Sequence, residues 1–165
     1  MLEQQLKDII SMGNNIKVQS LNMAMQAGKI KSLFPGSSLT YNQNSLTWKC
    51  WLQPSPLSAK YEIKLSYVTG DHPNVYVVSP KLTPYQGATK LKHVYDTTKQ
   101  WLCLYYRKGR EWNSGLLIAS TVIPWTCEWL LHHECWVATG TWHGGGIEHN
   151  TELEKQSAKD KEKSK

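Results

Sequence analysis

The chain has 165 residues, a formal net charge of +6, and eight tryptophans and eight tyrosines against one phenylalanine. This length favours one domain with its own core, and aromatic rings with polar tips suit both a core and a surface groove. The basic residues form no dense block of the kind that binds nucleic acid, and no apolar run is long enough to span a membrane.

The first 12 residues place the aliphatic side chains between Leu2 and Ile10 on one stripe, which predicts an amphipathic helix. They lack the apolar segment of a signal peptide. Four cysteines without an export signal therefore indicate reduced thiols in a cytoplasm. A second helical piece is expected over residues 16–27, and turn-forming residues predict an irregular segment from about 35 to 44.

Three strand patterns follow in quick succession, at Leu46–Gln53, Ala59–Val68 and Val75–Ser79. The second pattern alternates most regularly between apolar and polar residues. The short turns between the patterns indicate an antiparallel meander rather than parallel βαβ units. Because Cys50 shares a face with Trp48 in the first pattern, we interpret it as a core thiol.

The segment from Ser79 to Asp96 contains prolines and a glycine and predicts a loop. A short extended piece is expected at Trp101–Tyr106. The clearest helix runs from Thr121 to Trp136, with Pro124 close enough to its start to be tolerated. Its predicted apolar face consists of five large side chains: Val122, Trp125, Trp129, Leu130 and Trp136.

Residues 140–146 are rich in glycine, which predicts a flexible exit loop. From residue 149 onward the composition turns to charged and small polar residues with almost nothing to bury, which predicts a disordered tail. We therefore expect a folded domain over residues 1–148 and a charged tail over residues 149–165. The order helix, meander, loop, helix predicts an α+β fold with helices segregated around an antiparallel sheet.

Cys103 carries the strongest chemical signal in the sequence. It follows Trp101 and Leu102 and precedes a basic turn that contains Arg107, Lys108 and Arg110. Nearby cations lower the pKa of a thiol, and the thiolate is the form that reacts. We therefore expect a lowered pKa and a reachable nucleophile at Cys103. The alternative is a buried strand cysteine, the common state of a free cysteine.

This order of elements, with these residues, resembles the ubiquitin-conjugating (E2) family. In that family a long loop carries a His-Pro-Asn motif, the catalytic cysteine follows in a Cys-Leu pair, and a tryptophan and a helix come after it. Here His93 precedes Cys103 by ten residues, Leu104 completes the pair, and Trp112 matches the tryptophan. The resemblance covers roughly residues 1–137. It implies an E2-like fold with an N-terminal helix, a β-meander, an active-site loop and a central C-terminal helix.

The sequence departs from the family pattern at the motif itself. Tyr95 stands where the family has asparagine, so either its hydroxyl serves as the donor to an oxyanion or the transfer step differs. A literal His-Pro-Asn occurs at His72–Asn74, far along the chain from Cys103, and we interpret it as the family's proline turn, outside the site. The chain also lacks the two long C-terminal helices of eukaryotic members. In both departures the chain resembles the compact bacterial E2-like proteins of anti-phage operons, particularly the stand-alone E2-like protein of short type II CBASS systems.

The resemblance implies that Cys103 accepts the activated C-terminus of a protein partner as a thioester, then passes it to an amine or holds it. His93 would order the loop or polarise the thioester, and the glycine-rich segment would cover the groove. Four aromatic residues would line this groove for the partner's tail: Trp101, Tyr105, Tyr106 and Trp112. The implied partner is the C-terminal tail of a cGAS-like nucleotidyltransferase or of a ubiquitin-like protein, with a separate E1-like activating enzyme as a further candidate. No cofactor is expected.

Two alternatives remain open. Because the family asparagine is missing, the chain is alternatively a non-catalytic, E2-variant-like module that grips a partner tail. Cys127, His132, His133 and Cys135 lie close together in the sequence and suggest zinc, but they include no CxxC pair, and Cys127 does not share the helix face of His132 and Cys135. The two histidines also suit a polar helix end, where cations favour the helix dipole.

Overall fold

The computed structural model describes residues 18–146 of the chain. The predicted N-terminal helix over the first 12 residues and the charged tail over 149–165 lie outside the described residues. Within residues 18–146, no helix has the length and apolar character needed to cross a membrane. In chain order the elements are α2 (Met23–Leu33), β1 (Ser38–Tyr41), β2 (Ser45–Leu52), β3 (Tyr61–Val68), β4 (Asn74–Ser79), β5 (Val94–Asp96), β6 (Trp101–Leu102), the 3₁₀ helix η1 (Ile118–Ser120) and α3 (Val122–Thr139).

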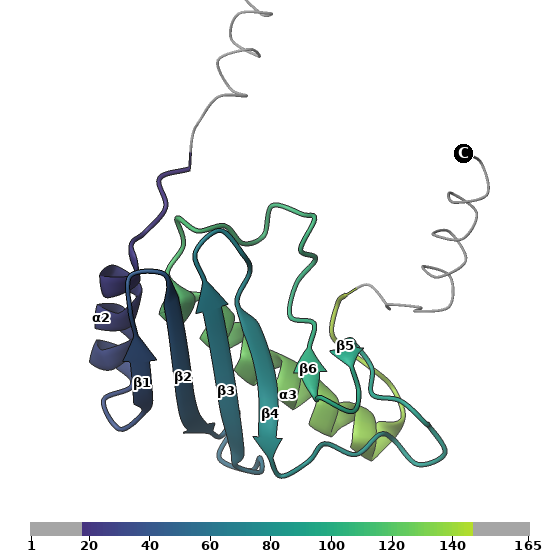
Figure 1. Ribbon diagram of the computed structural model, residues 1–165. Helices are drawn as coiled ribbons and strands as arrows, with labels where there is room; N and C mark the ends of the chain where they lie inside the picture. Colours follow the sequence, from purple (N-terminus) through teal and green to yellow (C-terminus); the bar gives the residue numbers. More distant parts are fainter. Residues whose placement is uncertain (1–17, 147–165) are drawn as a thin grey trace, which may run out of the picture.

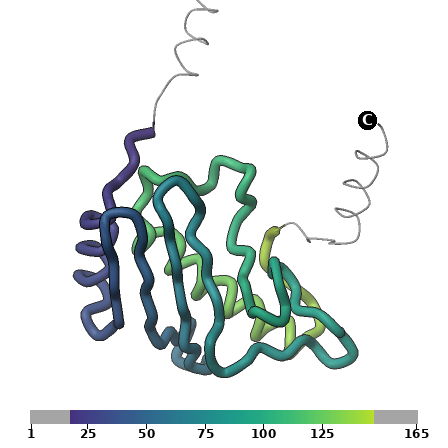
Figure 2. Tube along the Cα trace, in the orientation of Figure 1, coloured from purple at the N-terminus to yellow at the C-terminus, as the bar shows by residue number. Residues whose placement is uncertain are grey.

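The strands form one six-stranded sheet in the order β1-β2-β3-β4-β6-β5, and every neighbouring pair is antiparallel. Figure 1 shows α3 running diagonally behind this sheet and α2 standing beside β1. Figure 2 shows the end of the described chain, drawn in yellow, beside the β5–β6 hairpin. The α+β fold predicted from the sequence is confirmed, and the arrangement is compatible with an E2-like fold.

The second helix is displaced from its predicted position over residues 16–27. It begins at Met23 because the Asn22 side chain accepts a hydrogen bond from the Met25 amide at 2.9 Å and caps the first turn. Its core-facing side includes Ala27 and Ile30, both fully buried. The helical pattern predicts the helix but not its bounds, because its start is set by the Asn22 cap and not by the apolar period.

Three strands lie where the sequence predicts a turn-rich segment, a loop or one short extended piece. Strand β1 has four residues and pairs with β2, β5 has three, and β6 has two. Elements this short do not display a period of two clearly, and their pairing partners are set by the sheet. The predicted irregular segment from 35 to 44 is therefore wrong at β1, and the predicted loop from Ser79 to Asp96 is wrong at β5.

The alternation of β3 builds the centre of the core. Tyr61, Ile63, Leu65 and Tyr67 are all buried, as the pattern predicts. The buried face of α3 closes the core from the other side, and Tyr61 fixes the two layers together by donating a hydrogen bond to Glu134 Oε1 at 2.9 Å. The helix then ends at a glycine in the left-handed conformation, which turns the chain back along the sheet edge.

Gln26 joins α2 to the segment that leads into α3. Its side chain is fully buried, and its amide nitrogen donates to the carbonyl oxygen of Leu116 at 2.8 Å. Its amide oxygen accepts from the Ile118 amide at 2.9 Å. Buried backbone groups without partners are costly, so this one side chain satisfies two of them where no regular structure does.

We expect Gln26→Leu to lower the free energy of unfolding by roughly 2 to 4 kcal/mol, because it leaves two buried backbone groups without hydrogen bonds. Urea denaturation followed by tryptophan fluorescence measures the change. Met25→Leu, at an exposed position of the same helix, is the matched control and should stay within about 0.5 kcal/mol of the wild type. Equal stability of Gln26→Leu and the wild type would contradict the role given to this side chain.

Candidate functional site

The backbone of His93 fixes the position of Cys103. The Cys103 amide donates a hydrogen bond to the His93 carbonyl oxygen at 3.0 Å, and the indole Nε1 of Trp129 donates to the same oxygen at 3.0 Å. His93 has a φ of 48°, a left-handed conformation that few residues adopt. The Cys103 loop and α3 therefore meet at one carbonyl group, and His93 acts on Cys103 through its backbone.

The ring of His93 faces the glycine-rich segment. It is 8% exposed, and its centroid lies 4.7 Å from that of Trp142. A Cβ added at Gly146 would lie 2.7 Å from its Nδ1, and Gly146 has a φ of 129°. Residue 146 must therefore be glycine for this approach, for both steric and conformational reasons.

Tyr95 and Arg107 both act on the thiol of Cys103. The Tyr95 side chain hydrogen-bonds with that of Cys103, and its hydroxyl donates to the Tyr105 carbonyl oxygen at 3.4 Å. The Arg107 guanidinium lies over the rings of Tyr95 and Trp101, 4.9 and 5.2 Å from their centroids. Burial raises the pKa of Tyr95, so this phenol keeps its proton and is available as a donor.

The lowered pKa expected for Cys103 is wrong. The residue is 9% exposed, and burial raises the pKa of its thiol, an effect that the hydrogen bond from Tyr95 and the charge of Arg107 oppose without overcoming. The carboxylate of Glu111 raises this pKa further. Lys108 and Arg110 belong to the same basic turn but are exposed to solvent.

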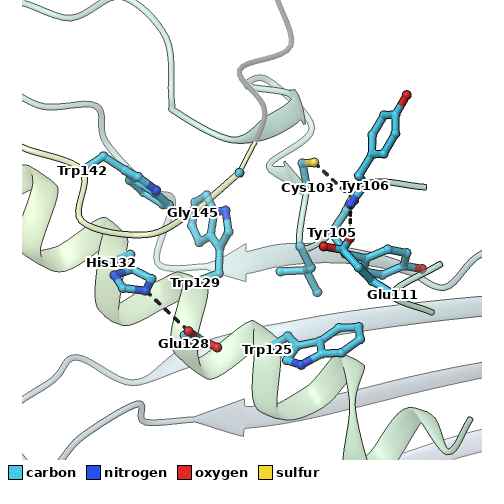
Figure 3. A pocket seen from close by; sticks show the side chains of 12 residues that line it. Cys103, Tyr105, Tyr106, Glu111, Trp125, Glu128, Trp129, His132, Trp142 and Gly145 are labelled. Atoms are coloured by element: carbon cyan, nitrogen blue, oxygen red, sulfur yellow. Dashed lines mark hydrogen bonds and ion pairs between the residues drawn. The ribbon is translucent and has the colours of Figure 1, made fainter. Parts of the chain in front are cut away.

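A cleft of about 680 Å³ opens beside Cys103 (Figure 3). One wall comes from the loop after β6: Cys103, Leu104, Tyr105, Tyr106 and Glu111. The other wall comes from α3 and the glycine-rich segment: Trp125, Glu128, Trp129, His132, Trp142, Gly145 and Gly146. The walls are thus largely aromatic, with carboxylates from both sides.

Of the four aromatic residues predicted to line the groove, two line the cleft and two pack elsewhere. Tyr105 and Tyr106 line the cleft. Trp112 is 5% exposed and packs edge-on against Tyr67 at 5.6 Å, in the core. Trp101 stacks on neighbouring rings of the sheet and lies under Arg107.

Four cleft residues on α3 were not assigned to the site from the sequence. Trp125, Glu128, Trp129 and His132 are spaced at i, i+3, i+4 and i+7, which places them on one helix face. Glu128 and His132 form an ion pair of 3.7 Å across one turn, with the charge of the histidine depending on its protonation. The spacing was available in the sequence, but two polar residues interrupt the apolar stripe that the prediction followed.

The glycine-rich segment, predicted as a flexible cover for the groove, forms part of a wall. Trp142 packs against Trp129 at 5.5 Å and His132 at 5.9 Å. A Cβ added at Gly144 would lie 2.7 Å from Cδ2 of His132. Glycine therefore lets this backbone pass close to α3, within reach of the cleft.

The literal His-Pro-Asn of His72–Asn74 lies against the Cys103 loop. His72 Nδ1 and the Tyr105 hydroxyl are 3.0 Å apart and share a hydrogen bond. Asn74 Oδ1 accepts from Arg107 Nη2 at 2.6 Å. The triplet leads into β4, whose first residue is Asn74, but treating it as separate from the site is wrong in space.

The four residues suggested for zinc do not converge. Within residues 18–146, no three His, Cys, Asp or Glu side chains gather into a group that could hold a metal ion. His133 is 3% exposed and stacks on Trp129 at 5.5 Å, and burial lowers its pKa to about 4. His133 is thus a neutral core residue and not part of a cationic helix end. Cys50 is half-buried and packs against the core.

Comparison with known families assigns the chain. The model of the type II CBASS E2 protein family matches residues 26–150, which include all six strands, the Cys103 loop and α3. No curated protein matches the chain. Because the family model covers well over half of the sequence, the chain belongs to the family of type II CBASS E2 proteins.

Proposed function

We propose that the protein is an E2-like acyl carrier of a bacterial CBASS antiviral system, in which Cys103 holds the C-terminus of a protein partner as a thioester. One observation supports this more than any other. Cys103 is the cysteine that lines the cleft among the described residues, where a wall of its own loop faces a wall from α3. A carrier needs a thiol at an accommodating groove, and the other cysteines lie elsewhere in the fold.

The reaction needs an activated acyl group, because a free carboxylate does not acylate a thiol. The thiolate of Cys103 attacks the carbonyl carbon of an acyl adenylate or thioester made by a separate activating enzyme. A C–S bond forms, and AMP or the activating enzyme's thiolate leaves. An amine then attacks the Cys103 thioester, an amide bond forms, and the Cys103 thiolate leaves. Any use of ATP belongs to the activating step.

The raised pKa of Cys103 suits a carrier that holds its cargo. Only a small fraction of the Cys103 thiol is ionised at neutral pH. Compared with a thiolate of lower pKa, however, the Cys103 thiolate is a stronger nucleophile and a poorer leaving group. A thioester on such a sulfur is lost more slowly to stray nucleophiles. Tyr95 keeps its proton and hydrogen-bonds with the thiol, so its hydroxyl is the donor that would stabilise developing negative charge.

The cleft fits an extended peptide tail. Its aromatic rings, Tyr105 and Tyr106 on one side and Trp125 and Trp129 on the other, offer broad apolar contact. His93 orders the Cys103 loop through its carbonyl group. We propose as the cargo the C-terminal tail of a cGAS-like nucleotidyltransferase, in keeping with the E2-like resemblance and the CBASS family.

A second candidate is a non-catalytic module that grips the partner tail without covalent chemistry. Two observations favour it: Cys103 is 9% exposed, and burial raises its pKa. A buried thiol of raised pKa is also the ordinary state of a core cysteine. The two candidates differ in one measurable product, the covalent adduct.

Intact mass spectrometry of the protein co-purified with its nucleotidyltransferase and any activating enzyme, without reductant, tests the carrier. We expect a wild-type adduct equal to the two masses less one water, released by dithiothreitol, and no adduct for Cys103→Ala. Cys103→Ser should form an oxygen ester that dithiothreitol does not cleave. Cys135→Ala, outside the cleft, is the matched control and should keep the adduct. A stable complex with no wild-type adduct would select the binding module.

The pH dependence of Cys103 alkylation tests its ionisation. Because burial raises the pKa of the Cys103 thiol above the ordinary value of a cysteine, its thiolate fraction should rise about tenfold per pH unit through the neutral range. Iodoacetamide rates at Cys103, measured by peptide mass spectrometry, should follow that slope. A plateau below pH 7 would mean a low-pKa thiolate and would contradict the burial argument.

A further inference from the structure

The side chain of Arg107 is held by the start of β4 and by the residue before it. Its Nη2 donates to Asn74 Oδ1 at 2.6 Å and to the Pro73 carbonyl oxygen at 3.3 Å. Asn74 is the first residue of β4, which pairs with β3 and β6, so its side chain projects from a fixed backbone. Arg107 itself lies in the loop after β6, where its guanidinium also packs over the rings of Tyr95 and Trp101 and its side chain hydrogen-bonds with that of Tyr95.

The position of the Arg107 guanidinium determines which groups its charge acts on. From there Arg107 covers the rings of Tyr95 and Trp101, at 4.9 and 5.2 Å, and its charge favours the thiolate of Cys103. An arginine side chain loses considerable rotamer entropy when it is fixed, so the half-buried Arg107 keeps this position only with partners that offset that loss. Asn74 and Pro73 supply two of these partners as hydrogen-bond acceptors.

We infer that Asn74 is a positioning residue of the Cys103 site, whose amide oxygen holds the Arg107 guanidinium where its charge stabilises the thiolate. His72 strengthens the same link, since its hydrogen bond with the Tyr105 hydroxyl at 3.0 Å ties the turn to the loop. This inference rests on the proposed use of Cys103 as a nucleophile, but the ionisation of the thiol can be measured without any partner.

Other groups also face Cys103, and their effects differ in sign. Tyr95 from β5 favours the thiolate by hydrogen bonding, and Glu111 from the loop after β6 opposes it by charge. Glu128 and His132 of α3 line the same cleft. Arg107 is the cation that lowers the pKa of Cys103, so moving it away leaves Glu111 and burial less opposed.

The rate of iodoacetamide alkylation at Cys103, measured by peptide mass spectrometry from pH 6.5 to 9.5, tests the inference on the full chain. Without its acceptor the guanidinium leaves its position, the pKa of the thiol rises and the thiolate fraction falls. We expect Asn74→Ala and Asn74→Val to move the profile to higher pH and to slow the reaction at pH 7.5 by roughly threefold to tenfold. The valine variant suits a strand and guards against loss of folding.

A double-mutant cycle separates positioning from general loosening. Arg107→Gln removes the charge and should slow alkylation to a similar extent, and Asn74→Val in that background should add almost nothing. Arg107→Lys keeps a cation and should slow alkylation less than Arg107→Gln does. Asn42→Ala is the matched control, because it deletes a side chain that accepts bonds of 2.8 and 2.9 Å in another turn and should leave the profile in place.

Two results would overturn the inference: an unshifted profile in both Asn74 variants, or an undiminished Asn74 effect in the Arg107→Gln background. Its failure is distinct from failure of the proposed function. A coupled shift in alkylation with no partner adduct would leave Asn74 as the positioning residue and remove the carrier role. A normal adduct without any coupled shift in alkylation would support the carrier role and remove the positioning role of Asn74.

Discussion

The carbonyl oxygen of His93 is the point on which the site depends, because it accepts hydrogen bonds from two separate elements. The Cys103 amide and the Trp129 indole both donate to it at 3.0 Å, so one group joins the thiol's loop to α3. A carbonyl has two lone pairs, and both are used here. The left-handed backbone of His93 persists because these contacts and the packing of its ring over-determine it.

Burial and reactivity oppose each other at Cys103. The same packing that fixes the sulfur also removes water from it, and this raises the pKa of the thiol. Tyr95 and Arg107 return part of the lost stabilisation to the thiolate, through a hydrogen bond and a charge. The result is a thiol that ionises rarely but sits in a defined geometry. Under the proposed function, a sulfur of this kind would hold an acyl group longer than a thiolate of low pKa would.

The sequence predicts best those features that repeat locally. The alternation of Tyr61–Val68 and the helix near Thr121–Trp136 were identified because burial imposes a period on the chain. β1, β5 and β6 are too short to carry a period, and the pairing of the sheet decides them. The pKa of Cys103 was mispredicted because sequence proximity reveals neighbouring cations but not desolvation.

The misassigned triplet shows the same limit at the level of the site. Sequence distance argued against a role for His72–Asn74, yet its side chains reach residues of the Cys103 loop 33 positions further along the chain. Contacts from the turn before β4, from Asn74 at the start of β4 and from α3 support the loop. Support of this kind leaves no local motif, because the residues that provide it are brought together by the sheet. A short motif can therefore indicate Cys103 as the proposed nucleophile, while the residues that contact its loop are found only in the fold.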